Sequence, residues 1–228
     1  KQSIDSGYFD EYMAVTLEQY PYSGLKLEDD FSTITHGKIQ LNIPTDCKLN
    51  TDILSDSAVD GFVSYTTGLE EEKALSVMID YHELDYSEHN DEEYKIFEDA
   101  VRETSIKEFG VSLDNHYNLT KTMWQMNDLE KNINYFSRNE VALYRFMLIM
   151  KMTMSSGINN YYEINTPTYC GFVSIRNNFL NSNNFNLVNL EIYSYDNLDV
   201  AYQVTISVKN GDINDAYKIL NSVEFVTE

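Results

Sequence analysis

The stretch LVNLEIYSYDNLDVAYQVTISVKNGDINDAYKILNSVEF, residues 187–225, decides the fold. Apolar side chains occupy every second position of its middle: Val200, Tyr202, Val204, Ile206 and Val208. A period of two predicts a strand over 200–209 with one buried face. A similar pattern predicts a strand over 187–195, and Asp196-Asn197 joins the two strands as a tight turn.

The period changes after the turn at Asn210-Gly211. Asp212 is a good N-cap residue for a helix. The apolar residues that follow it recur at intervals of three and four: Ile213, Ala216, Ile219, Leu220 and Val223. This spacing predicts a closing helix with one apolar face.

Earlier parts of the chain also alternate. Ile39, Leu41 and Ile43 are separated by polar residues, and Pro44 ends this strand because proline cannot donate to a ladder. Further strands are predicted at 62–66, 75–81, 123–126 and 170–175.

Residues 140–154 are open to two interpretations. All their even positions are apolar, which favours a long strand. Several odd positions in the middle are apolar too, so a buried helix is the competing prediction, and periodicity alone does not exclude it. We expect a strand here.

Two more helices are predicted in the N-terminal half. Asn90 caps the first, with Glu93 as its capping-box partner and Gly110 at its end. The second covers 5–20 and leads into a linker over 21–30. We therefore expect an N-terminal helix and linker in 1–30 and a single domain in 31–228.

Strands with one covered face, interrupted by helices, are typical of antiparallel sheets. The expected fold class is α+β, with a mostly antiparallel sheet and helices packed on it. The Asn-rich run 177–186 reads as a loop between strands.

The composition is strongly acidic. The 228 residues carry a net charge of −21, and 29 of the 37 acidic residues lie in 1–150. This balance argues against nucleic acid and against anionic lipid as partners. The excess acid is explained either by solubility or by a surface that binds cations or a basic partner.

The two cysteines, Cys47 and Cys170, leave a disulfide undecided and provide no CxxC motif. No signal peptide or membrane span is evident, because the longest apolar run, 141–150, is short and contains Arg145. The chain begins with Lys1, which we interpret as a processed form with any lipid anchor removed.

The densest cluster of metal-ligand residue types lies in 80–93. A divalent cation could be held there by His82, Glu83, Asp85, Glu88, His89 and Asp91. The HExxH pattern fails because position 86 is Tyr86, and the EF-hand pattern fails at Asn90 and Ile96. The competing interpretation is a solvated loop whose acids cap the following helix.

No catalytic motif is present. GxSxG, P-loop and GxGxxG patterns are absent, so no catalytic residue is predicted. Tyrosine is abundant, with 18 residues. A surface for a protein or glycan partner is predicted from the tyrosines expected in loops or at strand ends: Tyr65, Tyr161, Tyr162 and Tyr169.

Two motifs carry a resemblance. Residues 37–47, GKIQLNIPTDC, resemble the opening of Mog/PsbP-like domains, with Cys47 where that family usually has an aromatic residue. Residues 216–225, AYKILNSVEF, resemble the family's closing helix and strand. The resemblance implies an α+β fold and little chemistry, and the bacterial lipoprotein branch of the family fits the composition best.

The sequence therefore predicts a non-catalytic, extracytoplasmic binding or accessory domain of a bacterial lipoprotein or secreted protein, without a cofactor. Its partner would be an unidentified protein or glycan. The first alternative is a protein that binds divalent cations through 80–93. The last is a hydrolase that uses His82 or His89 with a carboxylate.

Overall fold

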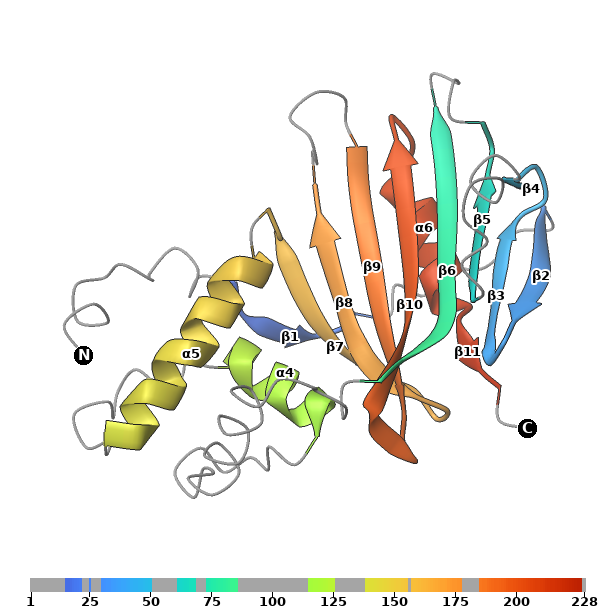
Figure 1. Cartoon of the computed structure of the whole chain (residues 1–228). Helices are drawn as coiled ribbons and strands as arrows, with labels where there is room; N and C mark the ends of the chain where they lie inside the picture. Colours follow the sequence, from blue (N-terminus) through green and yellow to red (C-terminus); the bar gives the residue numbers. More distant parts are fainter. Residues whose placement is uncertain are drawn as a thin grey trace.

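The structure, a computed structural model, describes residues 15–21, 25, 30–50, 61–68, 73–85, 115–125, 138–155, 157–177 and 185–226. A wide twisted sheet forms the centre, with helices on both of its faces and a small second sheet beside it (Figure 1). This arrangement confirms the predicted α+β class with a mostly antiparallel sheet.

In the described residues the large sheet has eight strands. In spatial order they are β1 (Leu17–Gln19), β7 (Asn160–Asn165), β8 (Cys170–Arg176), β9 (Phe185–Ser194), β10 (Asn197–Lys209), β6 (Ala74–Asp85), β5 (Phe62–Thr66) and β4 (Lys48–Leu49). Every neighbouring pair is antiparallel except β1 with β7.

The small sheet and the described helices complete the fold. The small sheet has the order β11 (Glu224–Phe225), β3 (Ile39–Pro44) and β2 (Phe31–His36). The helices are α4 (His116–Gln125), α5 (Arg138–Ser155) and α6 (Ile213–Asn221).

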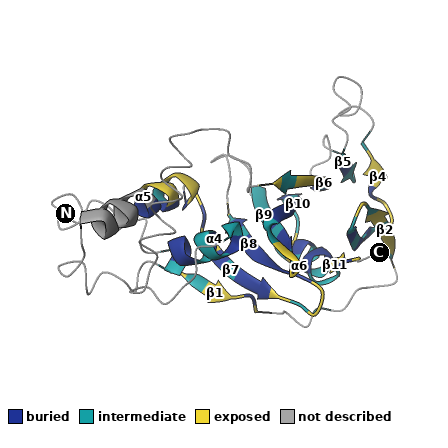
Figure 2. Cartoon of the chain, turned by 60° about the horizontal axis from the view of Figure 1, so that its bottom comes forward, coloured by how far each residue is buried: buried dark blue, intermediate teal, exposed yellow. Residues whose placement is uncertain are grey.

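One face of the large sheet is covered by α6 and the small sheet. The apolar positions of β10 point to this side, and Val204 and Ile206 have no exposed surface. Ile39 and Leu41 of β3 and Ile219 of α6 pack against them in the same cluster. Burying each such side chain contributes about 1.5–3 kcal/mol to folding, so this layer is the main core. In Figure 2 much of β7 and β8 is coloured as buried, whereas exposed stretches lie on β2, β4 and the end of β6.

Helix α6 is fixed at both ends. Asp212 accepts a hydrogen bond from the Asn214 backbone N–H at 2.9 Å, which satisfies one of the donors left free by the first turn. At the other end, the Ser222 hydroxyl donates to the Ile219 carbonyl and accepts from the Asn42 backbone N–H at 2.9 Å. Ser222 thus ties the helix end to β3.

The opposite face of the large sheet carries an aromatic layer under α4. Trp124 stacks on Tyr161 with ring centroids 3.8 Å apart, and Tyr117 stacks on Phe172 at 4.9 Å. Tyr193 meets both Tyr117 and Phe172 edge-on. This layer anchors α4 and, through Met147 and Leu148, α5.

A buried carboxylate lies at the edge of this layer. Glu163 of β7 accepts hydrogen bonds from Tyr117 (2.6 Å), Lys121 (2.6 Å) and Gln19 (2.8 Å). Burial by itself would raise the Glu163 pKa, but the hydrogen bonds from Lys121 and Tyr117 outweigh it and hold the pKa below its usual value. The cluster joins β1, β7 and α4.

Most strand predictions in the C-terminal half are confirmed. The expected strands at 170–175, 187–195 and 200–209 correspond to β8, β9 and β10, and the closing helix is α6 with Asp212 as its N-cap. In the N-terminal half, 39–43, 62–66 and 75–81 correspond to β3, β5 and β6.

The predicted strand over 140–154 is wrong, because these residues belong to helix α5. In the part with described side chains, Met147, Leu148, Lys151 and Ser155 are buried, at helical spacing. Met150 and Met154, which a strand would bury beside Leu148, are exposed. A helix places them on its other side, since each residue turns the chain by 100°.

Two shorter predictions are also wrong. Residues 123–125 of the expected strand 123–126 lie in α4, where Tyr117, Thr120 and Trp124 are buried at intervals of three and four. Leu17–Gln19, expected as helix, form β1 because they pair with β7. The predicted helix 90–110, most of 5–20 and most of the 177–186 loop lie outside the described residues.

The two cysteines are free and lie in different layers. Cys47 belongs to the main core and Cys170 to the aromatic layer on the other face of the sheet, so they do not bond to each other. Burial raises the pKa of the Cys47 thiol to about 12 and that of Cys170 to about 11. Among the described helices, none is long and apolar enough to cross a membrane.

Lys151 offers a test of the helix placement. It has no exposed surface, its ammonium donates to the Trp124 carbonyl at 3.4 Å, and it lies 5.5 Å from the Trp124 ring centre. Burial lowers its pKa from 10.5 to about 8. The folded state therefore binds fewer protons than the unfolded state between these values, and stability rises with pH across this window.

Lys151→Met removes this buried charge. We expect the variant to be more stable than the wild type at pH 7 by roughly 3 kcal/mol, and the difference to shrink as the pH approaches 10. Urea unfolding at several pH values measures it. A difference that stays constant from pH 7 to pH 10 would contradict the burial of this ammonium.

Candidate functional site

Strand β10 leaves its regular pairing with both neighbours near its start. Against β6, Ala201 pairs with Leu84 and Gln203 with Asp80, so three residues of β6 face Tyr202 alone. Against β9, three further residues of β10 are inserted before Ala201. Such bulges bend a sheet and change where its side chains point.

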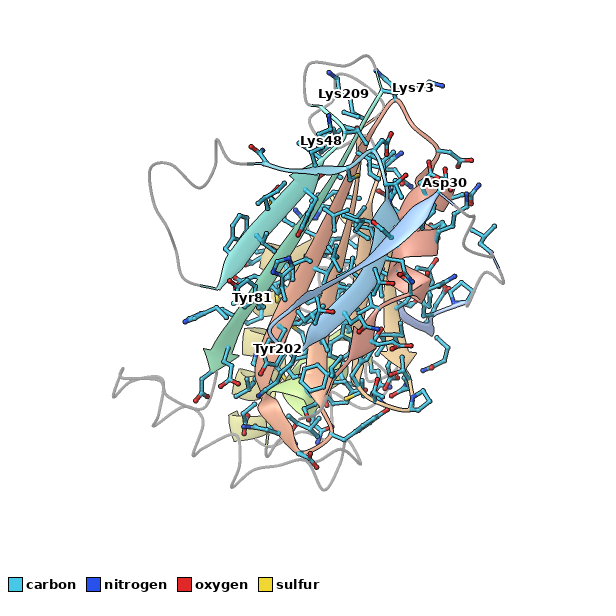
Figure 3. The ribbon with its side chains drawn as sticks, turned by 90° about the vertical axis from the view of Figure 1, so that its right-hand side faces the viewer. Asp30, Lys48, Lys73, Tyr81, Tyr202 and Lys209 are labelled. Atoms are coloured by element: carbon cyan, nitrogen blue, oxygen red, sulfur yellow. The ribbon has the colours of Figure 1, made fainter. Side chains whose placement is uncertain are left out.

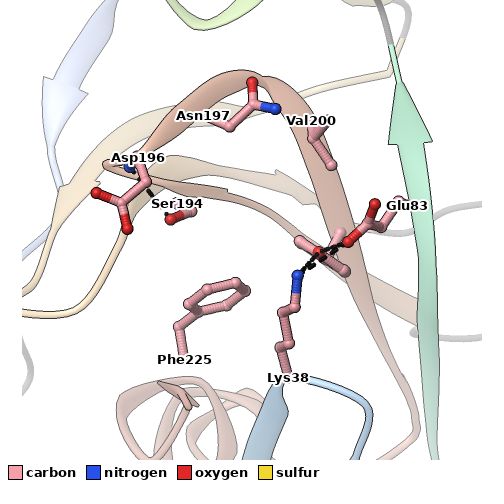
Figure 4. A pocket seen from close by; sticks show the side chains of 8 residues that line it. Lys38, Glu83, Ser194, Asp196, Asn197, Val200 and Phe225 are labelled. Atoms are coloured by element: carbon pink, nitrogen blue, oxygen red, sulfur yellow. Dashed lines mark hydrogen bonds and ion pairs between the residues drawn. The ribbon is translucent and has the colours of Figure 1, made fainter. Parts of the chain in front are cut away.

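A pocket of about 340 Å³ opens at this bend (Figure 4). Its lining comes from the turn between β2 and β3, from the ends of β6, β9 and β10, and from β11. The lining residues are Lys38, Glu83, Ser194, Asp196, Asn197, Val200, Tyr202 and Phe225. Six of the eight, all but Lys38 and Phe225, lie at or next to the irregular pairing.

Three polar side chains form a closed network on one wall. The Lys38 ammonium donates to Glu83 Oε1 at 2.9 Å and to the Tyr202 hydroxyl at 3.2 Å. The Tyr202 hydroxyl donates to the same Glu83 oxygen at 2.7 Å. Lys38 and Glu83 are about half exposed, so the network forms a wall that solvent reaches.

These contacts keep the three groups in fixed protonation states. The hydrogen bonds from Tyr202 and Lys38 lower the pKa of Glu83. The Glu83 carboxylate, followed by Tyr202, raises the pKa of Lys38. Burial, followed by the bond to Glu83, raises the pKa of Tyr202. Near neutral pH the network therefore consists of a carboxylate, an ammonium and a neutral phenol.

The turn before β3 holds Lys38 in place. Gly37 has a φ of 53°, and Lys38 returns to negative φ, which matches a two-residue hairpin with glycine first. A Cβ on Gly37 would lie 3.2 Å from the Tyr81 side chain. His36, just before the turn, is 2.8 Å from the Tyr65 hydroxyl and stacks on Tyr81. Figure 3 labels Tyr81 and Tyr202 beside the turn of this hairpin.

The opposite wall is the β9–β10 turn. The Ser194 hydroxyl accepts from the Asp196 backbone N–H at 3.2 Å, and the Asn197 side chain accepts from the Asp199 backbone N–H at 3.0 Å. The ring centroids of Phe225 and Tyr202 are 5.3 Å apart, and Phe225 forms the floor of the pocket. The pocket thus combines an apolar base with donors and acceptors on two walls.

A second pocket, of about 590 Å³, lies near the start of α6. Its charged lining residues are Asp30, Asp46, Asp212, Asp215, Lys73 and Lys218. Asp212 already caps α6, and Asp215 pairs with Lys218 at 3.4 Å. Although this pocket is larger, the interactions of its described side chains serve the α6 cap and the Asp215–Lys218 pair, so the 340 Å³ pocket with its three-residue network is the stronger candidate.

The structure separates the predicted cation ligands that it describes. His82 is exposed and points to the opposite face of β6 from Glu83, since strand neighbours alternate. Glu83 is bonded to Lys38, and Asp85 ends β6. Among the described residues, no group of three or more His, Cys, Asp or Glu is placed to hold a metal. Glu88, His89 and Asp91 lie outside these residues.

The predicted tyrosine surface is not one surface in the described structure. Tyr161 and Tyr169 are buried, because one belongs to the aromatic layer and the other to the main core. Tyr65 bonds to His36, and Tyr162 meets Tyr20 edge-on at 5.9 Å. Tyr161 and Tyr169 therefore offer no exposed ring to a partner here.

Sequence reasoning found Glu83 but missed its partners. The alternation places Tyr202 only on the core face of its strand, and Lys38 belongs only to a strand motif. The turn at Asp196-Asn197 was the one available signal for the second wall. No local pattern indicates that these residues meet, because the pairing of β6 with β10 brings together positions 119 residues apart.

Comparisons with known proteins concern the fold. No protein-family model matches the chain, and no curated protein matches it. A solved structure from Bacteroides thetaiotaomicron is similar at 11% identity with a TM-score of 0.37, over 86% of this chain and 48% of that one. The chain thus spans about half the length of the Bacteroides protein.

The Ran-binding protein Mog1p of Saccharomyces cerevisiae is similar at 9% identity, also with a TM-score of 0.37, over 86% of this chain and 95% of that one. At these identities the likeness concerns the fold alone, and no function passes from either protein to this chain.

Removing the Tyr202 hydroxyl tests the polar network. Because Tyr202→Phe deletes the largest cause of the lowered pKa, we expect the pKa of Glu83 to rise toward 4.5, while stability changes by less than about 1 kcal/mol. Carboxyl-carbon NMR titration measures the pKa. The network stabilises the folded state at pH values above the unfolded pKa of Glu83, which is 4.5. This stabilisation is lost as the pH falls through the lowered pKa of the folded state.

Tyr65→Phe is the matched control, since its hydroxyl bonds to His36 and not to Glu83. If the pKa of Glu83 is the same in the wild type and in Tyr202→Phe, the network does not form.

Proposed function

We propose that this chain is a non-catalytic binding or accessory domain, and that its ligand, or the protruding part of a partner, enters the pocket beside Lys38, Glu83 and Tyr202. The observation that carries this proposal is the closed polar network on the pocket wall. A wall whose groups are already oriented by one another loses little freedom when a ligand binds.

The protonation states of the wall favour binding over acid–base chemistry. A general acid or base works best with a pKa near the operating pH. Here the pKa of Glu83 is lowered, and those of Lys38 and Tyr202 are raised, so all three move away from neutrality. The hydrolase alternative has less support, because His82 lines neither of the two pockets described above.

Charge favours neutral or cationic ligands. Lys38 is matched by Glu83, and Asp196 leaves the lining with a net charge of −1 in a chain of net charge −21. An anionic ligand would meet repulsion from this field. The pocket volume of about 340 Å³ suits a small group, such as one sugar ring or one basic side chain, because the smallest ligand pockets have volumes of about 300 Å³.

We place the domain outside the cytoplasm, as part of a lipoprotein or a secreted protein, with a protein or glycan partner. The two motifs that resemble Mog/PsbP-like domains and the acidic, tyrosine-rich composition support this placement. Both described thiols are buried and closed to exchange, so they are compatible with an oxidising compartment.

The cation-binding alternative stays a prediction that calorimetry decides. Three of its six ligands lie outside the described residues, and Glu83 would have to leave Lys38 to join a site. Heat on addition of Ca²⁺, Zn²⁺ or Mn²⁺, together with a higher melting temperature, would support it. With neither response to any of the three ions, the alternative fails.

Three probes of different charge test the pocket: N-acetylglucosamine, arginine amide and inorganic phosphate. In amide NMR spectra of labelled protein, we expect saturable shifts at Lys38, Glu83, Asn197 and Tyr202 with a neutral or cationic probe and none with phosphate. Tyr202→Phe should weaken that binding about fivefold or more, since one hydrogen bond is worth about 1 kcal/mol.

Tyr65→Phe again serves as the control, because it lies beside the hairpin but outside the pocket lining. The proposal is contradicted if no probe moves the pocket amides more than amides elsewhere, or if phosphate binds as well as the other two probes.

A further inference from the structure

Strand β2 lies at the free edge of the small sheet. It pairs with β3 on one side, and no other described strand pairs with it. In Figure 1 it is the outermost strand at the right-hand margin, and Figure 3 labels Asp30 at the start of this strand. Six residues, Phe31–His36, therefore present one row of backbone groups to their surroundings.

The register shows which backbone groups face outward. In a two-residue hairpin the residues flanking the turn, here His36 and Ile39, form a hydrogen-bonded pair, and such pairs alternate along the ladder. The N–H and C=O groups of Phe31, Thr33 and Thr35 consequently point away from β3.

Strand β3 supports this alternation. The backbone groups of its even-numbered positions point away from β2, toward β11. The Asn42 N–H donates to Ser222 Oγ at 2.9 Å, and the Lys38 carbonyl accepts from the Val226 N–H at 2.8 Å. Pro44, which lacks an N–H, lies opposite Phe31. In this register the two form a non-hydrogen-bonded pair, so the missing N–H costs the ladder no hydrogen bond.

This edge lacks the usual protection against pairing. Natural edge strands carry lysine, proline or a bulge that blocks a further strand. The sequence FSTITH has no charged residue, apart from a histidine at its end, and no proline, and its register with β3 is regular over all six residues. The edge is suited to accept another strand.

We propose that β2 pairs with β2 of a second copy of this chain, antiparallel, with the two-fold axis at Thr33. This register makes Thr33 face Thr33 of the other copy and Phe31 face Thr35, so all outward groups meet in hydrogen-bonded pairs. The two small sheets become one continuous sheet of six strands.

Self-complementarity favours a second copy over an unrelated peptide. With the axis at Thr33, Asp30 of one copy lies opposite His36 of the other, in a close pair with Cα atoms about 4.5 Å apart. An acidic residue thus meets an imidazole at both ends of the contact. On the inner face, the half-buried Ile34 lies opposite Ser32.

The charge of the whole chain opposes this association at long range. Two copies of net charge −21 repel, and salt screens this repulsion over about 8 Å at physiological ionic strength. A single strand pair also buries less than a standard interface. The dimer should therefore be weak and should become tighter as salt is raised.

Single cysteines test the register. Thr33 and Thr35 are both exposed, on the same face of β2. In the proposed dimer, two copies of Thr33→Cys have Cα atoms about 5.5 Å apart, within disulfide range, whereas the Cα atoms of two copies of Thr35→Cys are roughly 14 Å apart. On mild oxidation at high protein concentration, we expect a covalent dimer from Thr33→Cys only; the native cysteines are buried.

Sedimentation of the untagged chain supplies a second readout. We expect the average mass to rise from 26.5 kDa toward twice that value between 10 μM and 1 mM, and more strongly in 500 mM than in 50 mM NaCl. Thr33→Pro removes an outward N–H that the β2–β3 ladder does not use, so it should stay folded and monomeric. Thr33→Val keeps the N–H and should still dimerise.

Equal cross-linking of Thr33→Cys and Thr35→Cys overturns the proposed register. A wild-type chain that stays at 26.5 kDa at 1 mM in both salt concentrations overturns the dimer, as does a folded Thr33→Pro variant that associates like the wild type. If Thr33→Pro fails to fold, the cysteine pair still decides the outcome.

Discussion

The pairing of β10 with β6 changes at Tyr202, and the geometry of that end of the molecule depends on this change. Up to Gln203 and Asp80 the two strands are in regular register, which keeps the apolar face of β10 against α6 and β3. Between the Gln203–Asp80 and Ala201–Leu84 pairs, two extra residues of β6 bend the sheet and bring Glu83 to the Tyr202 hydroxyl. Lys38 then links this bend to the small sheet.

Sequence periodicity predicted the parts of the fold whose burial is one-sided. Val204 and Ile206 alternate with polar residues, and the Asp212 cap marks α6, so β10 and the closing helix could be located. It failed for α5, where apolar residues occupy both faces: Ile149 and Met150 are exposed although their pattern resembles a buried strand. The helical spacing of the buried residues, with Met147 and Leu148 packed against the aromatic layer, distinguishes the two conformations.

The candidate site was less accessible to such reasoning. Glu83 was singled out because it lies in a dense acidic stretch, but its chemistry is set by Lys38 and Tyr202, which are distant in sequence. Register is a property of two strands together, and a bulge leaves no periodic trace in either one. The predicted cation site illustrates the same limit, since closeness in sequence put His82 and Glu83 on opposite faces of one strand.

Cross-strand NMR contacts at Ala201 test this account most directly. The register change predicts short proton–proton distances from Ala201 to Leu84 of β6, and from Gln203 to Asp80. Uninterrupted pairing would instead place Ala201 opposite His82 and Tyr202 opposite Tyr81. Contacts from Ala201 to Leu84 support the bend that forms the pocket, and contacts from Ala201 to His82 would contradict it.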